Sequence, residues 1–191
     1  MSRRSWGPAA AGLWLVAAIA VATIAGAKPA INVGGHYSLE DLSGRAVTEA
    51  SFRGKWQLIY FGFTSCPDIC PTALHQVHAA LDALGAEASN VQPLFVTLDP
   101  ERDTPDRLAA YLAHFDPRIV GLRGDRGQTE AAVAAFRVFY RVRKAAHSDA
   151  YSIDHSSFLF LMKPDGSFAR VLQAEDGGHE LAGALRGELG Q

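Results

Sequence analysis

Two cysteines stand four residues apart in the stretch QLIYFGFTSCPDICPTAL, and the sequence contains no other cysteine. Cys66 and Cys70 face the same way if the chain there turns or begins a helix, because positions i and i+4 share one side. Backbone N–H groups at a helix start favour negative charge and lower thiol pKa values. Thiolates attack disulfides and bind soft metals, so the pair predicts redox chemistry or a metal site.

A plain structural disulfide is the alternative interpretation of the two cysteines. Such a short loop contributes only about 2 kcal/mol through chain entropy. A disulfide that serves stability usually joins segments that are distant in sequence. Redox pairs are usually spaced C-x-x-C, whereas this pair is spaced C-x-x-x-C. The spacing therefore favours a metal over a disulfide.

Two thiolates leave a metal with too few ligands, and His155 is the best candidate for a third. It comes just before the apolar segment 158–162, which is typical of a strand. In a thioredoxin-like sheet this strand neighbours the one ending at Phe63, and the loop before it faces the cysteine loop. Thioredoxins hold a cis-proline in that loop, whereas here Asp154, His155 and Ser156 occupy it. Two thiolates and one imidazole suit copper, Cu(I) best and Cu(II) acceptably, whereas zinc prefers a fourth ligand. The alternative is that His155 only makes hydrogen bonds within its own loop and binds no metal.

The elements that position these residues follow from hydrophobic periodicity and from Gly- and Pro-rich breaks. Pro71 and Pro105 are each expected to open a helix, the second of them capped by Asp103 or Thr104. We expect strands at 58–63, 91–98, 118–122, 158–162 and 168–172, helices at 71–84, 105–115, 128–141 and 179–189, a loop at 145–153, and a preceding hairpin at 37–39 and 47–52. This alternation predicts an α/β fold with a parallel-type sheet and helices on both faces. Both thiols then lie at a strand-to-helix junction, where such sheets bind ligands.

The length and composition of the chain allow one folded domain and one additional segment at the N-terminus. The chain has 191 residues and a formal net charge of −2, so no basic field indicates nucleic-acid binding. Residues 8–27 carry no charge and are mostly Ala, Val, Leu and Ile, a run long enough to span a bilayer. With Arg3 and Arg4 on the cytoplasmic side, we expect residues 1–30 to anchor an exported domain of residues 31–191. A signal peptide cleaved after Ala27 is the alternative.

Several segments resemble the Sco/SenC family, copper-binding assembly factors for the dinuclear copper site of cytochrome c oxidase. These segments are residues 54–74, 91–105, 115–122 and 154–166, and they follow the family's order. The combination of a C-P-x-x-C-P motif with a downstream D-H-S motif is highly specific. The resemblance implies a thioredoxin-like (peroxiredoxin-like) sheet with flanking helices and an N-terminal β-hairpin. It also implies that Cys66, Cys70 and His155 bind copper, as Cu(I) or Cu(II). Asp99 resembles the family's acidic residue near the site, although a loop residue at a strand end is an equal alternative. Asp154 is a second candidate to support the ligands.

The resemblance implies a copper metallochaperone that delivers copper to, or prepares, the copper site of the oxidase. Its partners are then the copper-site subunit of cytochrome c oxidase and other periplasmic copper carriers. An anchor in the inner membrane places the domain in the periplasm or an equivalent exported compartment. A thiol–disulfide oxidoreductase that reduces the cysteines of the oxidase copper site is the alternative.

A peroxidase is the third class of function that we considered. Residues 70–72 superficially resemble the cysteine region of peroxiredoxins, whose catalytic cysteine follows the pattern P-x-x-x-[TS]-x-x-C. The corresponding positions before Cys70 hold Phe63 and Pro67, so the activating hydroxyl is missing. The sequence therefore disfavours peroxidase activity.

Overall fold

The protein is described by a computed structural model that covers residues 33–144 and 150–190. The predicted membrane segment 1–30 lies outside the described residues. Among the helices of the described ranges, none has the length and apolar character needed to cross a membrane.

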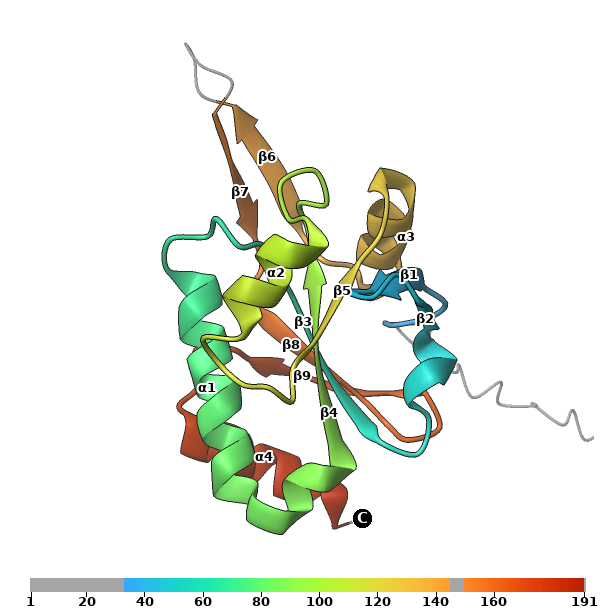
Figure 1. Cartoon of the computed structure of the whole chain (residues 1–191). Helices are drawn as coiled ribbons and strands as arrows, with labels where there is room; N and C mark the ends of the chain where they lie inside the picture. The colour runs from blue at the N-terminus through green and yellow to red at the C-terminus, as the bar shows by residue number, and fades with distance from the viewer. Residues whose placement is uncertain (1–32, 145–149, 191) are drawn as a thin grey trace, which may run out of the picture. The chain divides into compact units, whose positions relative to one another are not determined.

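A seven-stranded sheet forms the centre of the domain (Figure 1), with the strand order β2-β1-β5-β4-β3-β8-β9. The central strands β3, β4 and β5 run parallel, and the strands that flank them pair antiparallel. The almost continuous burial of β3 and β4 agrees with their apolar sequences. The strands are β1 (Ser38–Asp41), β2 (Ala46–Thr48), β3 (Trp56–Gly62), β4 (Val91–Thr97), β5 (Val120–Arg123), β8 (Phe158–Met162) and β9 (Phe168–Gln173).

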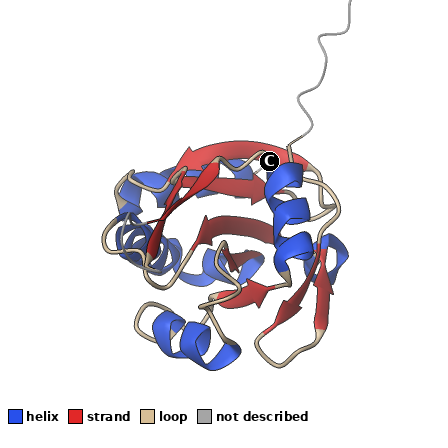
Figure 2. Ribbon diagram, turned by 90° about the horizontal axis from the view of Figure 1, so that it is seen from above, coloured by secondary structure: helices blue, strands red, loops and turns tan. Residues whose placement is uncertain are grey.

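Helices cover both faces of this sheet (Figure 2), as predicted. On one face, Phe136 of α3 contacts Phe61 and Phe160, with both ring centroids 5.4 Å away. On the other face, Tyr111 of α2 contacts Phe95 at 6.0 Å. The helices are α1 (Ile69–Leu84), α2 (Pro105–Leu112), α3 (Arg126–Phe136) and α4 (Gly178–Leu189), and short 3₁₀ helices span Glu49–Phe52 and Gly85–Asn90.

A second, two-stranded sheet is the main difference from the sequence-based expectation. Strands β6 (Tyr140–Lys144) and β7 (Tyr151–His155) pair antiparallel and extend beyond the central sheet (Figure 1). The predicted helix 128–141 ends early because Arg137 adopts a left-handed conformation with φ 53°. The predicted loop 145–153 therefore ends in strand β7, and His155 is the last residue of that strand.

The start of α1 differs in detail from the expectation, whereas α2 begins at Pro105 as predicted, with one of the two expected caps. Helix α1 begins at Ile69, so Pro71 is its third residue and not its first. Thr104, and not Asp103, caps α2: its side chain accepts a hydrogen bond from the Arg107 backbone N–H at 3.3 Å. The predicted N-terminal hairpin is present, but its second strand gives way to the 3₁₀ helix at Glu49.

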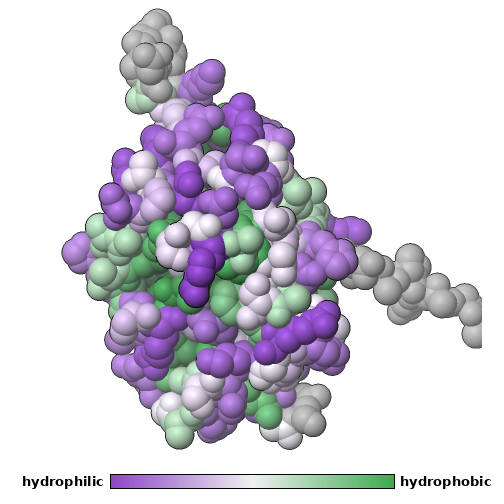
Figure 3. Space-filling model, turned by 45° about the vertical axis from the view of Figure 1, so that its right-hand side comes forward, coloured by the Kyte–Doolittle hydropathy of each residue, from purple (hydrophilic) through white to green (hydrophobic). Residues whose placement is uncertain are grey.

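Polar side chains cover most of the surface seen in Figure 3, around a hydrophobic area in the middle of that face. The large hydrophobic side chains exposed in the described residues are Phe139, Val142, Phe158 and Val171. Two of them, Phe139 and Val142, flank or belong to strand β6, so the added hairpin supplies part of the exposed apolar surface.

A buried ion network ties α1 to the loop before β5. Asp116 is 1% exposed and accepts hydrogen bonds from His78 Nδ1 at 2.8 Å and from Arg118 Nε at 2.8 Å. Arg118 also bonds Asp82 of α1 at 2.6 Å. His78, Asp82 and Asp116 hold donor atoms within 4.8 Å of one another, but the Arg118 guanidinium already pairs with both carboxylates. This cluster therefore joins structural elements through charge and is not a good cation site.

The Asp116 network predicts an acid-sensitive contribution to stability. Burial opposes ionisation of Asp116, but the hydrogen bonds from Arg118 and His78 outweigh it and lower the pKa to about 2 from 3.8. A lowered folded-state pKa stabilises the fold above pH 4 and loses that effect as the pH falls towards 2. Asp116→Asn is expected to reduce the free energy of unfolding by about 2 kcal/mol at pH 7 in urea titrations.

The same urea titrations, repeated at pH 3 and with a matched variant, test whether the ionised Asp116 carboxylate causes this stabilisation. The difference between wild type and Asp116→Asn is expected to shrink at pH 3. Asp82→Asn removes the exposed partner of Arg118, since the Asp82 side chain is 59% exposed. This variant is expected to lower the free energy of unfolding by less than about 1 kcal/mol. Equal losses in the two variants would contradict a specific role of the buried carboxylate.

Candidate metal centre

The loop between β3 and α1 holds both cysteines at the edge of the central sheet. The Cys66 backbone N–H donates to the Phe63 carbonyl at 3.2 Å, which forms a tight turn after the strand. The Cys70 backbone N–H, in the first turn of α1, points at the Cys66 sulfur at 3.4 Å. The Asp68 side chain, at the N-cap, makes no capping hydrogen bond. The Cys66 sulfur therefore accepts from an N–H that the helix itself cannot satisfy.

Close packing brings the Cys70 sulfur directly onto the sheet. Cys70 is fully buried, and the sulfur lies over Gly62, the last residue of β3. A Cβ atom at Gly62 would lie only 3.0 Å from the Cys70 sulfur and 3.0 Å from the Phe95 ring. Glycine therefore leaves room for the sulfur and the ring, since a side chain here would require one of them to shift.

His155 reaches the cysteine loop from the end of β7. Its Nε2 lies 3.2 Å from the Cys70 sulfur, although the two residues are 85 positions apart. Its Nδ1 lies 3.0 Å from the Ser156 carbonyl oxygen, which can only accept, so Nδ1 carries the proton. The lone pair on Nε2 therefore faces the sulfur pair. The rings of Tyr60 and Phe63 hold the imidazole edge-on at 6.1 and 5.8 Å.

The two thiols have opposite electrostatic environments. The hydrogen bond from Cys70 is the largest influence on Cys66 and, together with the neighbouring His155 side chain and the backbone N–H groups, lowers the pKa of Cys66 to about 4 against the effect of burial. Burial raises the pKa of the Cys70 thiol far above its ordinary value, and the neighbouring Cys66 raises it further. In the reduced, metal-free protein Cys66 is therefore a thiolate, and Cys70 keeps its proton beside Cys66 and His155.

The donor atoms of Cys66, Cys70 and His155 all lie within 4.8 Å of one another. The structure thus brings together the three side chains that the sequence singled out. Soft thiolates with one imidazole form a donor set suited to copper. In the described part of the chain, no further His, Cys, Asp or Glu joins this group of donor atoms, so the fourth ligand that zinc prefers is not at hand.

A buried carboxylate that sequence reasoning treated only as a candidate helix cap anchors the cysteine loop. Asp103 accepts hydrogen bonds from the Thr64 backbone N–H at 3.1 Å, the Thr64 hydroxyl at 2.6 Å and the Thr97 hydroxyl at 2.6 Å. Arg107 adds bonds to the Thr64 hydroxyl at 2.9 Å and the Ser65 hydroxyl at 2.7 Å. The two residues before Cys66 are therefore fixed from α2 and from the loop before it.

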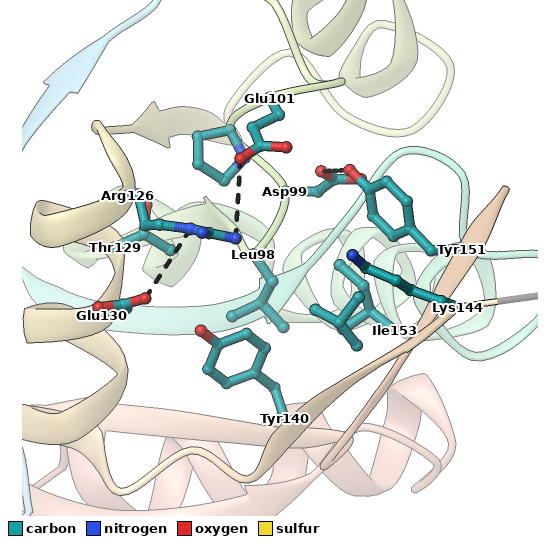
Figure 4. A pocket seen from close by; sticks show the side chains of 12 residues that line it. Leu98, Asp99, Glu101, Arg126, Thr129, Glu130, Tyr140, Lys144, Tyr151 and Ile153 are labelled. Atoms are coloured by element: carbon teal, nitrogen blue, oxygen red, sulfur yellow. Dashed lines mark hydrogen bonds and ion pairs between the residues drawn. The ribbon is translucent and has the colours of Figure 1, made fainter. Parts of the chain in front are cut away.

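Asp99 holds the β6–β7 hairpin at the end where Tyr151 pairs with Lys144. It accepts a hydrogen bond from the Tyr151 hydroxyl at 2.6 Å (Figure 4) and pairs with Arg102. Arg102 stacks on the Tyr151 ring at 3.7 Å and donates to its carbonyl at 2.9 Å. Tyr151 precedes His155 by four residues on β7. Asp99 therefore helps to position β7, the strand that carries the imidazole of His155 to the candidate centre.

A cavity of about 380 Å³ lies beside this contact, under the hairpin (Figure 4). Tyr151 and Ile153 line it, and His155 follows them on the same face of β7 because side chains alternate along a strand. Arg126 in its wall pairs with Glu101 at 3.7 Å and Glu130 at 4.0 Å. The cavity and the candidate centre are therefore neighbours along one strand.

Asp154 has a separate set of contacts. It precedes His155 on β7, so its side chain leaves the opposite face of the strand. There it pairs with Arg143, which lies two positions along β6 from Arg141, the register partner of Asp154. The group of donor atoms around the cysteines includes neither Asp154 nor Asp99 in the described residues.

Comparisons with known proteins agree with this fold. A family model described as SCO1/SenC matches residues 25–190. Protein sco1 of Schizosaccharomyces pombe is 42% identical over 157 residues, which cover 81% of this chain and 60% of that protein. The SCO2-like protein RC0895 of Rickettsia conorii is 38% identical, covering 83% of this chain and 78% of that protein. The chain thus spans less than two thirds of the yeast relative but more of the bacterial one.

Solved structures give the same result. ScoI from Bradyrhizobium japonicum with copper bound has a TM-score of 0.74 and 38% identity, covering 81% of this chain and 98% of that chain. BsSco, a member of the Sco family of cytochrome c oxidase assembly proteins, shares the fold at a TM-score of 0.62 and 23% identity, covering 83% of this chain and 95% of that chain. The thioredoxin-like fold expected from the sequence is therefore confirmed. On its sequence, its fold and the extent of the match, this chain belongs to the SCO1/SenC family.

Proposed function

We propose that this protein is a copper metallochaperone that carries one copper ion on Cys66, Cys70 and His155. The observation that carries this proposal is the convergence of two sulfurs and one imidazole nitrogen within 4.8 Å, from elements distant in sequence. Copper is the cargo, and the two thiolates with a neutral imidazole suit Cu(I) best while tolerating Cu(II). The copper-bound relative supports this choice of metal.

Exchange of the ion requires that a partner's ligand can approach it. Cys70 is fully buried, but Cys66 retains 8% exposure, and the neighbouring Ser65, Pro67 and Asp68 are exposed. A partner thiolate can therefore reach a three-coordinate ion from the side of Cys66. The buried Cys70 and the half-buried His155 hold the ion until that exchange, and the bonds of Asp103 keep the loop in place during it.

The partner that we propose is the copper-site subunit of cytochrome c oxidase, whose dinuclear copper site would receive the ion. Other periplasmic copper carriers would act as donors. The domain would face the periplasm, or an equivalent exported compartment, with residues 1–30 as its anchor in the inner membrane. The family membership and the uncharged N-terminal run of the sequence support this placement.

A second candidate function is thiol–disulfide exchange with the cysteines of the same oxidase site. The lowered pKa of Cys66 favours it, because a thiolate is the attacking group in such exchange. Cys66 would attack a partner disulfide, form a mixed disulfide and release one partner thiolate. Cys70 would then lose its proton and attack Cys66, which releases the second partner thiolate and leaves Cys66 and Cys70 as a disulfide. A Cys66–Cys70 reduction potential too low for exchange with the partner's thiols would exclude this role.

Copper titration tests the first function. The reduced chain is expected to bind one Cu(I) under anaerobic conditions, measured by competition with a chromophoric chelator. Cys66→Ser, Cys70→Ser and His155→Ala are each expected to weaken binding by more than about 100-fold, because the loss of a mere supporting residue already costs 10- to 100-fold. The loaded chain is expected to pass its copper to the metal-free copper-binding domain of the oxidase subunit.

His75→Ala is the matched control for the titration, since His75 lies on α1 and contacts Phe115 away from the cysteines. It is expected to leave copper affinity unchanged. Unchanged affinity in His155→Ala would remove the imidazole from the site and contradict the proposed ligand set.

Alkylation of the reduced, metal-free chain tests the thiolate. Iodoacetamide is expected to modify Cys66 before Cys70, at a rate nearly independent of pH between 6 and 8, because the lowered pKa keeps Cys66 ionised throughout. An ordinary cysteine slows by about tenfold per pH unit below its pKa. Cys70→Ala removes the main hydrogen bond to Cys66 and is expected to restore pH dependence. A wild-type rate that already rises tenfold per unit from pH 6 to 8 would contradict this electrostatic assignment.

A further inference from the structure

Tyr60 lies between the two deeply placed side chains of the candidate centre. It belongs to β3, is 1% exposed, and shares a sheet face with Gly62, over which the Cys70 sulfur lies. Its ring meets the His155 ring edge-on at 6.1 Å, with the planes at 70°. The side chain is therefore fixed by packing beside both Cys70 and His155, and none of the interactions assigned so far uses its hydroxyl.

The Tyr60 hydroxyl is buried and has no well-aligned hydrogen-bond partner in the described residues. Leaving such a group unpaired is costly, and a native structure usually provides it with an acceptor in some state. The Cys70 sulfur lies on the same side of the sheet: the His155 ring that Tyr60 contacts has its Nε2 only 3.2 Å from that sulfur. In agreement with this placement, Cys70 raises the pKa of the Tyr60 phenol after burial does.

Copper binding changes how strongly the Cys70 sulfur can accept a hydrogen bond. A neutral thiol is only a weak acceptor. A thiolate is a strong one, because hydrogen bonds to an ionised acceptor are about twice as strong as neutral ones. Metal binding requires the thiolate form and releases the thiol proton to solvent. The acceptor that Tyr60 lacks is thus created when the site is loaded.

We propose that the Tyr60 hydroxyl donates a hydrogen bond to the Cys70 sulfur in the copper-loaded protein, and thereby adjusts both copper affinity and the balance between Cu(I) and Cu(II). This role rests on the copper site proposed above. Tyr60 keeps its own proton and acts through the sulfur, so it is a positioning residue and not a ligand. The hydrogen bond draws electron density from the sulfur, which weakens donation to Cu(II) more than to Cu(I). Hydrogen bonding around a cysteine sulfur is a known control of copper potentials.

Tyr111 is a second phenol near the same sulfurs and helps to define the assignment. Its hydroxyl is also buried and unpaired in the described residues, and Cys70 and Cys66 raise the pKa of its phenol after burial does. The Tyr111 ring, however, packs against Phe95 and Phe115, whereas the Tyr60 ring contacts the His155 ring beside the sulfur. The geometry therefore selects Tyr60 as the donor.

Tyr60→Phe in the full chain tests the inference, because it deletes one oxygen and keeps the ring. Cu(I) affinity is expected to fall about tenfold, as for the loss of one hydrogen bond to a charged group. The sulfur-to-copper charge-transfer band of the Cu(II) form is expected to move to lower energy, and the Cu(II)/Cu(I) potential to a lower value. The urea midpoint of the metal-free chain is expected to stay the same or rise, since an unpaired buried hydroxyl is removed.

Two matched variants separate this role from a general effect of losing a buried hydroxyl. Tyr37→Phe removes a buried phenol that bonds Gln57 away from the cysteines, and Tyr111→Phe removes the neighbouring phenol. Both are expected to leave the charge-transfer band in place. An unchanged band and affinity in Tyr60→Phe, or a shift in Tyr111→Phe alone, would overturn the role of Tyr60. A wild-type chain that binds no copper would instead defeat the proposed function itself.

Discussion

The antiparallel register between β3 and β8 is the constraint on which the candidate centre depends. Tyr60 pairs with Leu159, so the loop after β3 and the residues before β8 meet at one edge of the sheet. That edge is where Cys66 and Cys70 follow one strand and His155 precedes the other. A slip of one residue would turn the fully buried Leu159 and the nearly buried Phe160 to opposite faces. The apolar core therefore fixes where the imidazole stands relative to the sulfurs.

The parts of this arrangement that the sequence predicts are those with a short-range pattern. The apolar run of β3, the helical spacing of α1 and the apolar run of β8 each identify their element, and the spacing of Cys66 and Cys70 identifies their shared chemistry. The family motif then selects His155 from seven histidines. The start of α1 was misplaced by two residues, since proline is tolerated anywhere in a first helical turn, where the N–H groups lack partners.

The parts that the sequence does not predict are long-range polar contacts and an ambiguous segment. Asp103 bonds Thr64 across 39 positions, and Arg102 bonds the Tyr151 carbonyl across 49, and neither contact leaves a periodic signal. The helix predicted at 128–141 includes the first two residues of β6, because Val133, Phe136 and Tyr140 fit a helical spacing until Arg137 breaks it. The unpaired hydroxyl of Tyr60 likewise appears only when the strands and the cysteine loop are assembled.

The glycine at the end of β3 makes the metal-binding sulfur part of the hydrophobic core. With no side chain at Gly62, Cys70 rests against the sheet backbone and the Phe95 ring, so the same atoms serve core packing and metal binding. A mutational scan would consequently score this backbone position as a folding defect and a loading defect at once. Transplanting the copper site into another scaffold would require moving the glycine and the aromatic ring with the three ligands, since a cysteine grafted onto an ordinary strand end would stand too far from the sheet.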